Sequence, residues 1–246
     1  MMKNMTLWNI ARACHGRFII PAKKPQQACP KEGMRTIRAA SNLEAKGVVL
    51  DSRKVEPGFV FVAAKGEKVD GHSFIPEVFA KGAIGVICER EPEELLGPCI
   101  VVKDSLLALQ DVAAFYREQT AVTVVGVTGS VGKTSTKEFI ASVLAQKYKT
   151  HKTQGNYNNE VGVPLTLLSM PEGTQAAVVE MGINHFGEMH RLSRMAKPDI
   201  CVMTNIGQCH LEYLGSRDGI LRAKSDEAEQ LEVIKQLEAE FQEVTD

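Results

Sequence analysis

A short glycine-rich segment of the chain carries residue types that bind phosphate. Gly129 and Gly132 let the backbone approach an anion closely, and successive N–H groups in such a turn form an anion-binding nest. Lys133 adds a cation for the outer phosphates of a nucleotide, and the Thr134 hydroxyl can ligate Mg²⁺. The predicted nucleotide-binding positions in this segment are Thr128, Gly129, Ser130, Val131, Gly132, Lys133, Thr134 and Ser135.

The flanks of this segment favour a phosphate loop over an ordinary turn. An apolar run at residues 122–127 predicts a buried strand before the loop, and helical spacing of apolar residues predicts a helix after it. The strict loop pattern has glycine where this chain has Val127. An ordinary strand-to-helix turn does not explain Lys133 and Thr134 at the helix start, so we expect phosphate binding here. The residues expected on the apolar side of the helix are Phe139, Ile140, Val143 and Leu144.

A magnesium ion at this loop needs hard oxygen ligands from elsewhere in the chain. Glu180 directly follows the apolar run at residues 176–179, which predicts an acid at the carboxyl end of a buried strand, where open α/β sheets bind ligands. The alternative is an exposed carboxylate at a strand end. His210 follows another apolar run, at residues 200–203, but its spacing alone indicates a structural histidine more than a metal ligand.

The remaining pattern predicts an α/β fold in two parts that meet near residues 118–121. We expect a mixed α/β domain over residues 1–120, a partial P-loop domain over residues 121–224, and a charged amphipathic helix over residues 225–246. Residues 21–45 lack sustained periodicity and are predicted to form a loop insertion. The predicted strands are residues 48–50 and 59–63, joined by a turn, and residues 84–88, 99–102, 122–127, 176–179 and 200–203. The other predicted helices are residues 6–14, 75–81, 105–117 and 186–195.

The composition argues against several classes of function. The 246 residues carry a formal net charge of −1, so no global field draws the chain to nucleic acid or to an anionic membrane. The six cysteines are scattered without a Cys-x-x-Cys pair, so neither a zinc knuckle nor a disulfide framework is indicated. No apolar run approaches the roughly 20 residues needed to cross a bilayer. We therefore expect a cytoplasmic protein that inserts into no membrane and binds no nucleic acid.

Four blocks of sequence, in this order, resemble the Mur ligase family. They are residues 126–135, 155–166, 180–185 and 204–224. In the first part of the chain, residues 51–53, 57–58 and 70–72 are similar to the family's UDP-sugar-binding domain. Within the family, the resemblance is strongest to the ligases that add D-alanyl-D-alanine to UDP-N-acetylmuramoyl-tripeptide.

The resemblance implies an ATP-dependent amide-bond ligase of peptidoglycan precursor synthesis, with ATP and Mg²⁺ as cofactors. In that reaction ATP phosphorylates a substrate carboxylate, and the incoming amine attacks the acyl phosphate to give an amide, ADP and phosphate. By resemblance, the catalytic positions are Lys133, Glu180, His210 and Lys224. The metal positions are Thr134, Glu180, His210 and, if carbamylated, Lys224. The family-like positions for nucleotide are Asn156 and Asn159, and those for the UDP sugar are Ser52, Arg53 and His72.

The resemblance stops after Lys224, where family members continue with the rest of the central sheet and a further domain. We therefore expect weak or no turnover by this chain alone, and a complementing C-terminal chain would be consistent with the pattern. The alternative functions are the ligase that adds the third amino acid, a relative similar to folylpolyglutamate synthase, and a non-catalytic module that binds ATP or a UDP sugar. For Lys224 the alternative is a surface lysine at a helix start.

Overall fold

The computed structural model describes residues 2–21, 37–66 and 69–206. The chain divides into two compact units, which we describe separately. Unit 1 comprises Met1–Ala121 together with Leu167–Glu172, and unit 2 comprises Val122–Thr166 together with Gly173–Asp246. The segment Leu167–Glu172, which the sequence pattern had placed in the P-loop domain, therefore packs with the first unit.

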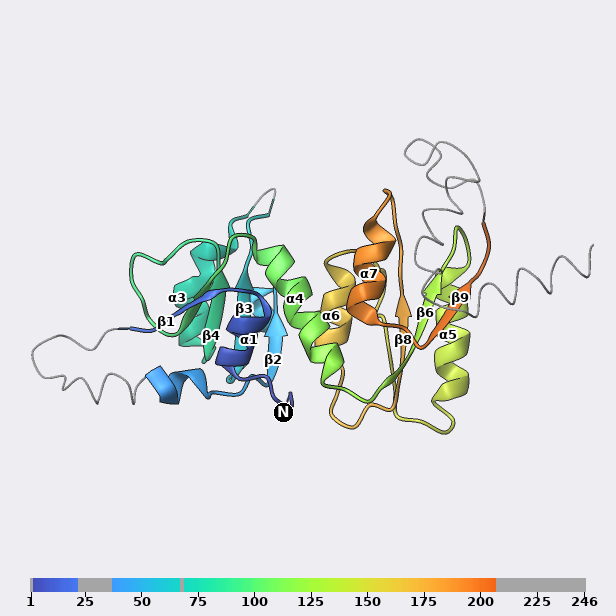
Figure 1. Ribbon diagram of the computed structural model, residues 1–246, viewed down its shortest axis with the longest axis horizontal. Coiled ribbons are helices and arrows are strands. Elements are labelled where there is room, and N and C mark those ends of the chain that lie inside the picture. The colour runs from blue at the N-terminus through green and yellow to red at the C-terminus, as the bar shows by residue number, and fades with distance from the viewer. Residues whose placement is uncertain (1, 22–36, 67–68, 207–246) are drawn as a thin grey trace, which may run out of the picture. The chain divides into compact units, whose positions relative to one another are not determined.

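Unit 1 is built on a five-stranded sheet in the order β1-β5-β4-β3-β2 (Figure 1). Its strands are β1 (Arg17–Ile19), β2 (Gly47–Val49), β3 (Phe59–Ala63), β4 (Gly85–Cys88) and β5 (Cys99–Val101). Strand β1 is antiparallel to β5, and all other pairs are parallel. The predicted turn before the second apolar run is present at residues 57–58, but β2 and β3 run in the same direction, and the 3-10 helix η1 (Ser52–Lys54) also lies between them.

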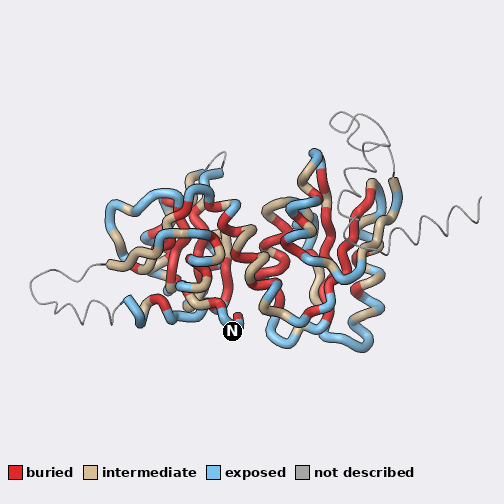
Figure 2. Tube along the Cα trace, in the orientation of Figure 1, coloured by how far each residue is buried: buried red, intermediate tan, exposed pale blue. Residues whose placement is uncertain are grey.

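Helices cover the parallel strands of unit 1. They are α1 (Leu7–Ala13), α3 (Ile75–Ala80) and α4 (Ser105–Glu118), with a 3-10 helix η2 (Gly71–Phe74) before α3. Helix α4 begins at Asp104, whose carboxylate accepts hydrogen bonds from the backbone N–H groups of Leu106 and Leu107. Figure 2 shows the buried chain running through the strands, where β3 and β4 supply much of an apolar core.

The predicted loop insertion is only partly a loop. Residues 37–41 are helical, Glu44 forms a β-bridge with Thr6, and the side chain of Ala45 is fully buried. The sequence signal fails here because a short helix of mixed composition has too few turns to show periodicity. Residues 22–36 lie outside the described part of the chain.

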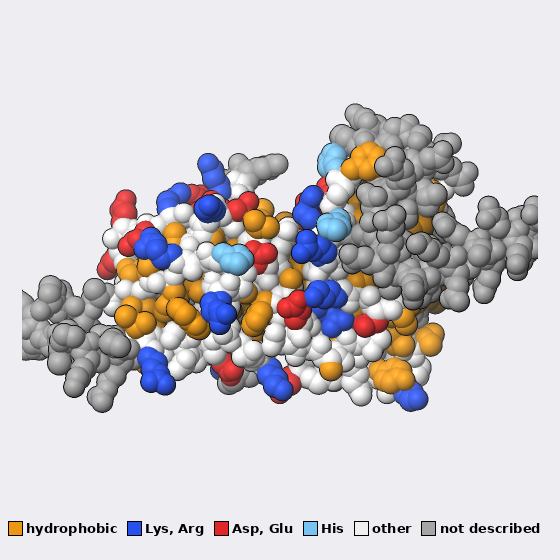
Figure 3. All heavy atoms as spheres, viewed as in Figure 1, with side chains coloured by type: hydrophobic (Ala, Val, Ile, Leu, Met, Phe, Trp, Pro, Cys, Tyr) orange, Lys and Arg blue, Asp and Glu red, His pale blue; other side chains and the backbone are white. Residues whose placement is uncertain are grey.

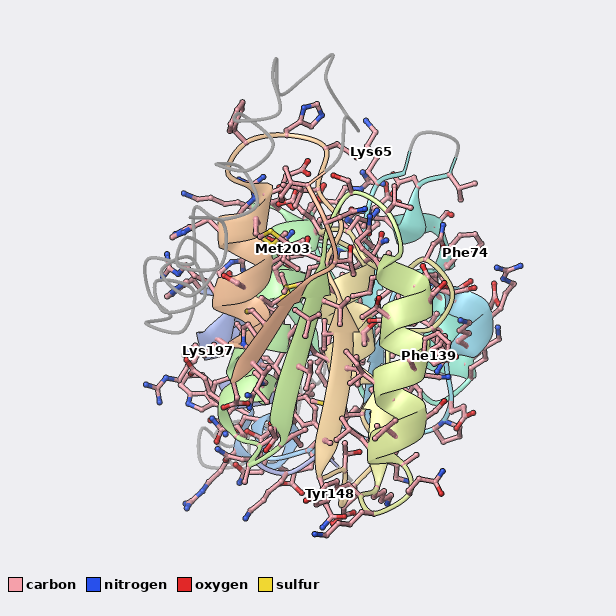
Figure 4. All side chains as sticks on the ribbon, turned by 90° about the vertical axis from the view of Figure 1, so that its right-hand side faces the viewer. Lys65, Phe74, Phe139, Tyr148, Lys197 and Met203 are labelled. Carbon is pink, nitrogen blue, oxygen red and sulfur yellow. The ribbon has the colours of Figure 1, made fainter. Side chains whose placement is uncertain are left out.

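Unit 2 contains a four-stranded parallel sheet in the order β7-β8-β6-β9. The strands are β6 (Thr123–Thr128), β7 (Thr150–Lys152), β8 (Ala176–Glu180) and β9 (Ile200–Met203). The helices are α5 (Lys133–Leu144), α6 (Gly162–Leu168), whose last two residues belong to unit 1, and α7 (Glu188–Ala196). Figure 4 shows α5 on one side of the sheet and α7 on the other. The fold class predicted from the sequence, a mixed α/β domain followed by a partial P-loop domain, is confirmed, and the structure adds that all strand pairs except β1 with β5 are parallel.

Helix α5 presents a different face to its sheet from the one predicted. Phe139 and Val143 are 74% and 71% exposed, whereas Lys137 and Ala141 are buried. Ile140 and Leu144 do pack against the core formed by β6 and β8. The apolar side predicted from the sequence was too wide, because it included Phe139, which points away from the sheet (Figure 4). The buried side of the helix includes Lys137 instead.

The surface carries no dominant charge on the face shown in Figure 3, where Lys and Arg side chains alternate with Asp and Glu. Among the described residues, no helix has the length and apolar character to pass through a membrane. The predicted tail helix at residues 225–246 lies outside the described residues.

Candidate nucleotide-binding site

The glycine-rich segment connects the carboxyl end of β6 to the start of α5. Strand β6 is central, with β8 on one side and β9 on the other. The chain leaves β6 through α5 toward β7, and later returns through α7 to β9 on the opposite side. The loop therefore lies where the direction of strand addition reverses, which is the usual ligand-binding position in open α/β sheets.

Two glycines give the loop its shape. Gly129 has φ +137° and Gly132, the residue before the first turn of α5, has φ +85°. A Cβ atom at Gly129 would lie 2.0 Å from the hydroxyl of Thr204, so no larger residue fits without rearrangement. Backbone N–H groups at the start of α5 have no acceptor within the helix, so the loop has the donors and the helix dipole that an anion requires.

The residues that follow β9 hold the outer side of the loop. Asn205 accepts hydrogen bonds from the backbone N–H groups of Ser130, through its carbonyl at 3.0 Å, and of Val131, through its side chain at 2.9 Å. The Thr204 hydroxyl donates to the carbonyl of Val131 at 2.6 Å. The sequence pattern did not assign these two residues a role, although both lie in a block that resembles the Mur ligases.

Lys133 folds back over the loop. Its ammonium group donates to the carbonyl oxygens of Gly129, at 2.8 Å, and Ser130, at 3.5 Å. A lysine in this position carries its charge next to the loop N–H groups and can exchange carbonyl oxygens for phosphate oxygens.

Glu180, at the end of β8, is brought to the same site. Its side chain is 1% exposed, which contradicts the alternative of an exposed strand-end carboxylate. Oxygen Oε1 accepts hydrogen bonds from the Thr134 hydroxyl at 3.3 Å and from the Asn158 amide at 2.8 Å. The structure therefore unites two of the predicted metal positions, Thr134 and Glu180, and adds Asn158, which the sequence analysis missed.

Glu180 is held from its backbone as well as from its side chain. Its N–H donates to the hydroxyl of the buried Thr153 at 2.9 Å. The carbonyl of Thr153 accepts a hydrogen bond from Lys137, another buried residue that the sequence analysis did not select. Lysines of a helix are normally exposed, so no sequence signal marked this one.

The donor set around Glu180 fits Mg²⁺. A carboxylate and a hydroxyl are hard oxygen ligands of the kind this ion prefers. Among the described residues, Glu180 Oε2 is one of two buried side-chain oxygens or nitrogens without a hydrogen-bond partner, the other being the Thr128 hydroxyl. The described residues contain no group of three or more His, Cys, Asp and Glu side chains that could hold a metal. His210 and Lys224 lie outside the described part.

The two asparagines expected at the nucleotide, Asn156 and Asn159, lie in the segment before α6. Asn159 Oδ1 accepts from the backbone N–H groups of Val161 and Gly162 and so caps the turn that leads into α6. Asn156 is exposed, and its carbonyl accepts from the N–H of Asn158 at 2.7 Å. The asparagine that reaches the acid of the site is thus Asn158.

In unit 1, two of the residues expected at the UDP sugar lie in η1. Ser52 is buried, and its carbonyl accepts a hydrogen bond from Lys81 at 3.0 Å. Arg53 is 85% exposed and forms two side-chain hydrogen bonds with Asp51, which lower the pKa of Asp51 to about 2. The Arg53 guanidinium is thereby held at the surface at the carboxyl end of β2.

His72, the third of these residues, has a structural position. Its ring is buried, Nε2 accepts from the backbone N–H of Glu89 at 2.9 Å, and Nδ1 donates to Asp70 at 2.7 Å. Hydrogen bonds from the backbone N–H of His72 and from Arg90 hold the pKa of Asp70 far below its usual range. Both ring nitrogens are therefore engaged within unit 1.

The loop, its lysine and the buried acid beside it define unit 2 as an open parallel α/β domain of the phosphate-loop class. Two family models extend this conclusion. One, described as "Mur ligase family, catalytic domain", matches residues 44–126, and the other, described as "Mur ligase middle domain", matches residues 127–235. The chain belongs to the Mur ligase family.

Curated relatives show which members of the family are similar. The UDP-N-acetylmuramoyl-tripeptide–D-alanyl-D-alanine ligase of Bacillus subtilis (strain 168) is 48% identical over 182 residues, which are 72% of this chain and 39% of the relative. The ligase of the same name from Escherichia coli (strain K12) is 40% identical over 186 residues, which are 76% of this chain and 41% of the relative. The chain thus spans about two fifths of the length of these relatives.

Solved structures agree with the curated relatives. MurF from Acinetobacter baumannii has a TM-score of 0.74 and 38% identity, with 89% of this chain and 45% of that chain covered. The MurF ligase from Thermotoga maritima in complex with ADP has a TM-score of 0.68 and 39% identity, with 74% of this chain and 42% of that chain covered.

Proposed function

We propose that unit 2 binds the phosphates of ATP, with Mg²⁺, at the loop between β6 and α5. The observation that carries this proposal is the convergence of Lys133, Thr134 and the buried Glu180 on one helix start. The ADP complex of the similar Thermotoga maritima ligase supports the choice of nucleotide.

In this proposal each residue has a separate task. The N–H groups of the first turn of α5 bind phosphate oxygens, and Lys133 moves from the loop carbonyls to the outer phosphates. Thr134 and Glu180 hold the metal ion, which offsets negative charge on the transferred phosphoryl group. Thr204 and Asn205 hold the conformation of the loop while ATP is converted to ADP.

We further propose the reaction in the names of the relatives for the protein to which this chain corresponds. That reaction is ATP-dependent ligation of D-alanyl-D-alanine to UDP-N-acetylmuramoyl-tripeptide through an acyl phosphate, in the cytoplasm, as a step of peptidoglycan precursor synthesis. Unit 1 would bind the UDP sugar, and the exposed Arg53 suits a diphosphate because its planar guanidinium can donate two parallel hydrogen bonds. The proposal includes His210 and Lys224 as further metal positions, both outside the described residues.

ATP binding is tested by calorimetric titration of the purified chain and of its Lys133→Ala variant. Loss of a charged hydrogen-bond donor removes about 1.5–3 kcal/mol, so we expect ATP affinity to fall about 10-fold to 100-fold. Lys147→Ala, at an exposed lysine just beyond α5, is the matched control and should bind as the unmodified chain does. Equal affinity in the Lys133→Ala variant would refute the site.

The ligase reaction is tested separately, with ATP, Mg²⁺, UDP-N-acetylmuramoyl-tripeptide and D-alanyl-D-alanine. Formation of the pentapeptide product that disappears in Lys133→Ala would support the full reaction in this chain. ATP binding without product would support a binding module that needs a complementing chain. Replacement of D-alanyl-D-alanine by a single amino acid, with the UDP-dipeptide as acceptor, tests the third-residue ligase.

A further inference from the structure

Lys137 is a buried cation beside the acid of the proposed site. It lies one helical turn after Lys133 on α5, and its side chain is 1% exposed. Burial of an ammonium group costs several kcal/mol unless charges and hydrogen bonds compensate it. A residue with that cost is expected to have partners that require its charge.

The ammonium group of Lys137 has three partners on three segments. It donates to the Thr153 carbonyl at 2.9 Å, and it lies 3.2 Å from Glu138 Oε1 and 3.7 Å from Glu180 Oε2. Glu138 is also paired with Lys152 of β7, and hydrogen bonds from Lys152 and Lys137 lower the pKa of Glu138. Lys137 therefore connects α5, the segment after β7, and the end of β8.

The two oxygens of Glu180 are treated differently. Oε1 receives two hydrogen bonds from neutral donors, Thr134 and Asn158. Oε2 receives none among the described residues, and its 3.7 Å separation from the Lys137 ammonium is too long for a hydrogen bond. Lys137 thus attracts Oε2 electrostatically, and the lone pairs of Oε2 remain free of a hydrogen bond from the lysine.

Thr153 completes this arrangement. Its carbonyl accepts from Lys137, and its hydroxyl accepts from the backbone N–H of Glu180. The three residues form a closed set of contacts in which the lysine and the acid cannot move independently.

We propose that Lys137 is a positioning residue, which holds the Glu180 carboxylate so that Oε2 stays available to a divalent cation at the phosphate loop. Lys137 touches neither the loop nor, in this proposal, the nucleotide. Its effect is therefore on the metal-dependent part of nucleotide binding. This inference rests on the proposed binding of ATP and Mg²⁺ by unit 2.

The test is calorimetric titration of the chain with ATP, once with Mg²⁺ and once with EDTA, in the Lys137→Met variant. We expect the ratio of the two affinities to fall about tenfold, equivalent to about 1.4 kcal/mol, while the affinity in EDTA changes less than about twofold. Lys147→Met, the same substitution at an exposed lysine, is the matched control and should leave the ratio unchanged. A purely structural lysine would lower stability without changing this ratio.

The outcomes separate the proposed binding of ATP and Mg²⁺ by unit 2 from the proposed positioning role of Lys137. If the unmodified chain does not bind ATP, or binds it equally with Mg²⁺ and EDTA, the proposed function fails. If it binds with Mg²⁺ dependence and folded Lys137→Met retains the full ratio, the positioning role of Lys137 is overturned. If Lys137→Met does not fold, Lys137→Gln, which keeps a donor for the Thr153 carbonyl, carries the same test. Failure of both variants to fold would make Lys137 a residue of the fold alone and would also overturn the inference.

Discussion

His72 resembles a substrate-binding position of the family, and its ring is also a buried part of unit 1. Its ring bridges the carboxylate of Asp70, which caps η2, and the backbone N–H of Glu89, which directly follows β4. A buried N–H that loses its acceptor is not compensated by water. The first effect of its removal should therefore be on stability.

We expect His72→Ala to lower the free energy of unfolding by about 1–3 kcal/mol, because the N–H of Glu89 would be buried without a partner. Urea unfolding followed by circular dichroism measures this. His190→Ala, at an exposed histidine, is the control and should stay within about 0.5 kcal/mol of the unmodified chain. An unchanged unfolding curve in His72→Ala, with weaker binding of a UDP sugar, would instead favour a ligand contact.

At the residue scale the sequence predicted the acid Glu180 and the neighbouring Thr134, but not Asn158 and Lys137 beside them. Glu180 was predicted because it directly follows an apolar run, and such a run indicates where a buried strand ends. Lys137 was missed because its burial depends on how α5 is turned against the sheet, which apolar spacing did not resolve. Asn158 was missed because it lies in an irregular segment where no periodicity applies.

At the scale of elements, the loop between β6 and α5 depends on a close approach to the segment after β9. Gly129 is where the two backbones meet, and its φ of +137° is outside the range of other residues. The position of the loop is therefore coupled to Thr204 and Asn205, far away in sequence.

We expect Gly129→Ala to abolish measurable ATP binding, because the added Cβ would lie 2.0 Å from the Thr204 hydroxyl and must displace the loop. Gly155→Ala is a matched control, since Gly155 also has positive φ, +51°, but a Cβ there meets nothing within 4 Å. The control should lose only about 1–2 kcal/mol of stability and keep its nucleotide affinity. Normal binding by Gly129→Ala would show that the loop does not need this shape.

The strands that the sequence missed share one property. Strands β1 and β7 have three residues each, Arg-Phe-Ile and Thr-His-Lys, and none of these six residues is buried. Such strands are defined by their partners, β5 and β8, and not by their own residues. The longer apolar strands were all predicted because burial on both faces of a parallel sheet leaves a continuous signal.

At the scale of the whole molecule, the chain passes between its two compact units three times. The last crossing follows Leu167–Glu172, a segment of unit 1 that is flanked on both sides by unit 2. In unit 1 the hydroxyl of Tyr116 donates to the carbonyl of Met170 at 3.5 Å, and Leu168 and Met170 are buried. Neither unit is therefore a single stretch of sequence.

We expect a protease site introduced between Ala121 and Val122 to give two fragments that stay together in size-exclusion chromatography. The reason is that the second fragment carries Leu167–Glu172, which packs in unit 1. Separation of the fragments in non-denaturing buffer would show instead that Leu167–Glu172 does not hold the second fragment to the first.

The strand order of unit 2 also determines how this domain can be made on a ribosome. Strand β6 is synthesised first, yet both of its neighbours, β8 and β9, come later in the chain. At roughly 5–20 residues per second, its apolar residues wait several seconds for the first of these partners to emerge. During that time the nascent chain exposes an unpaired apolar strand that can aggregate. The yield of folded protein should therefore depend on translation speed and on chaperones that bind β6.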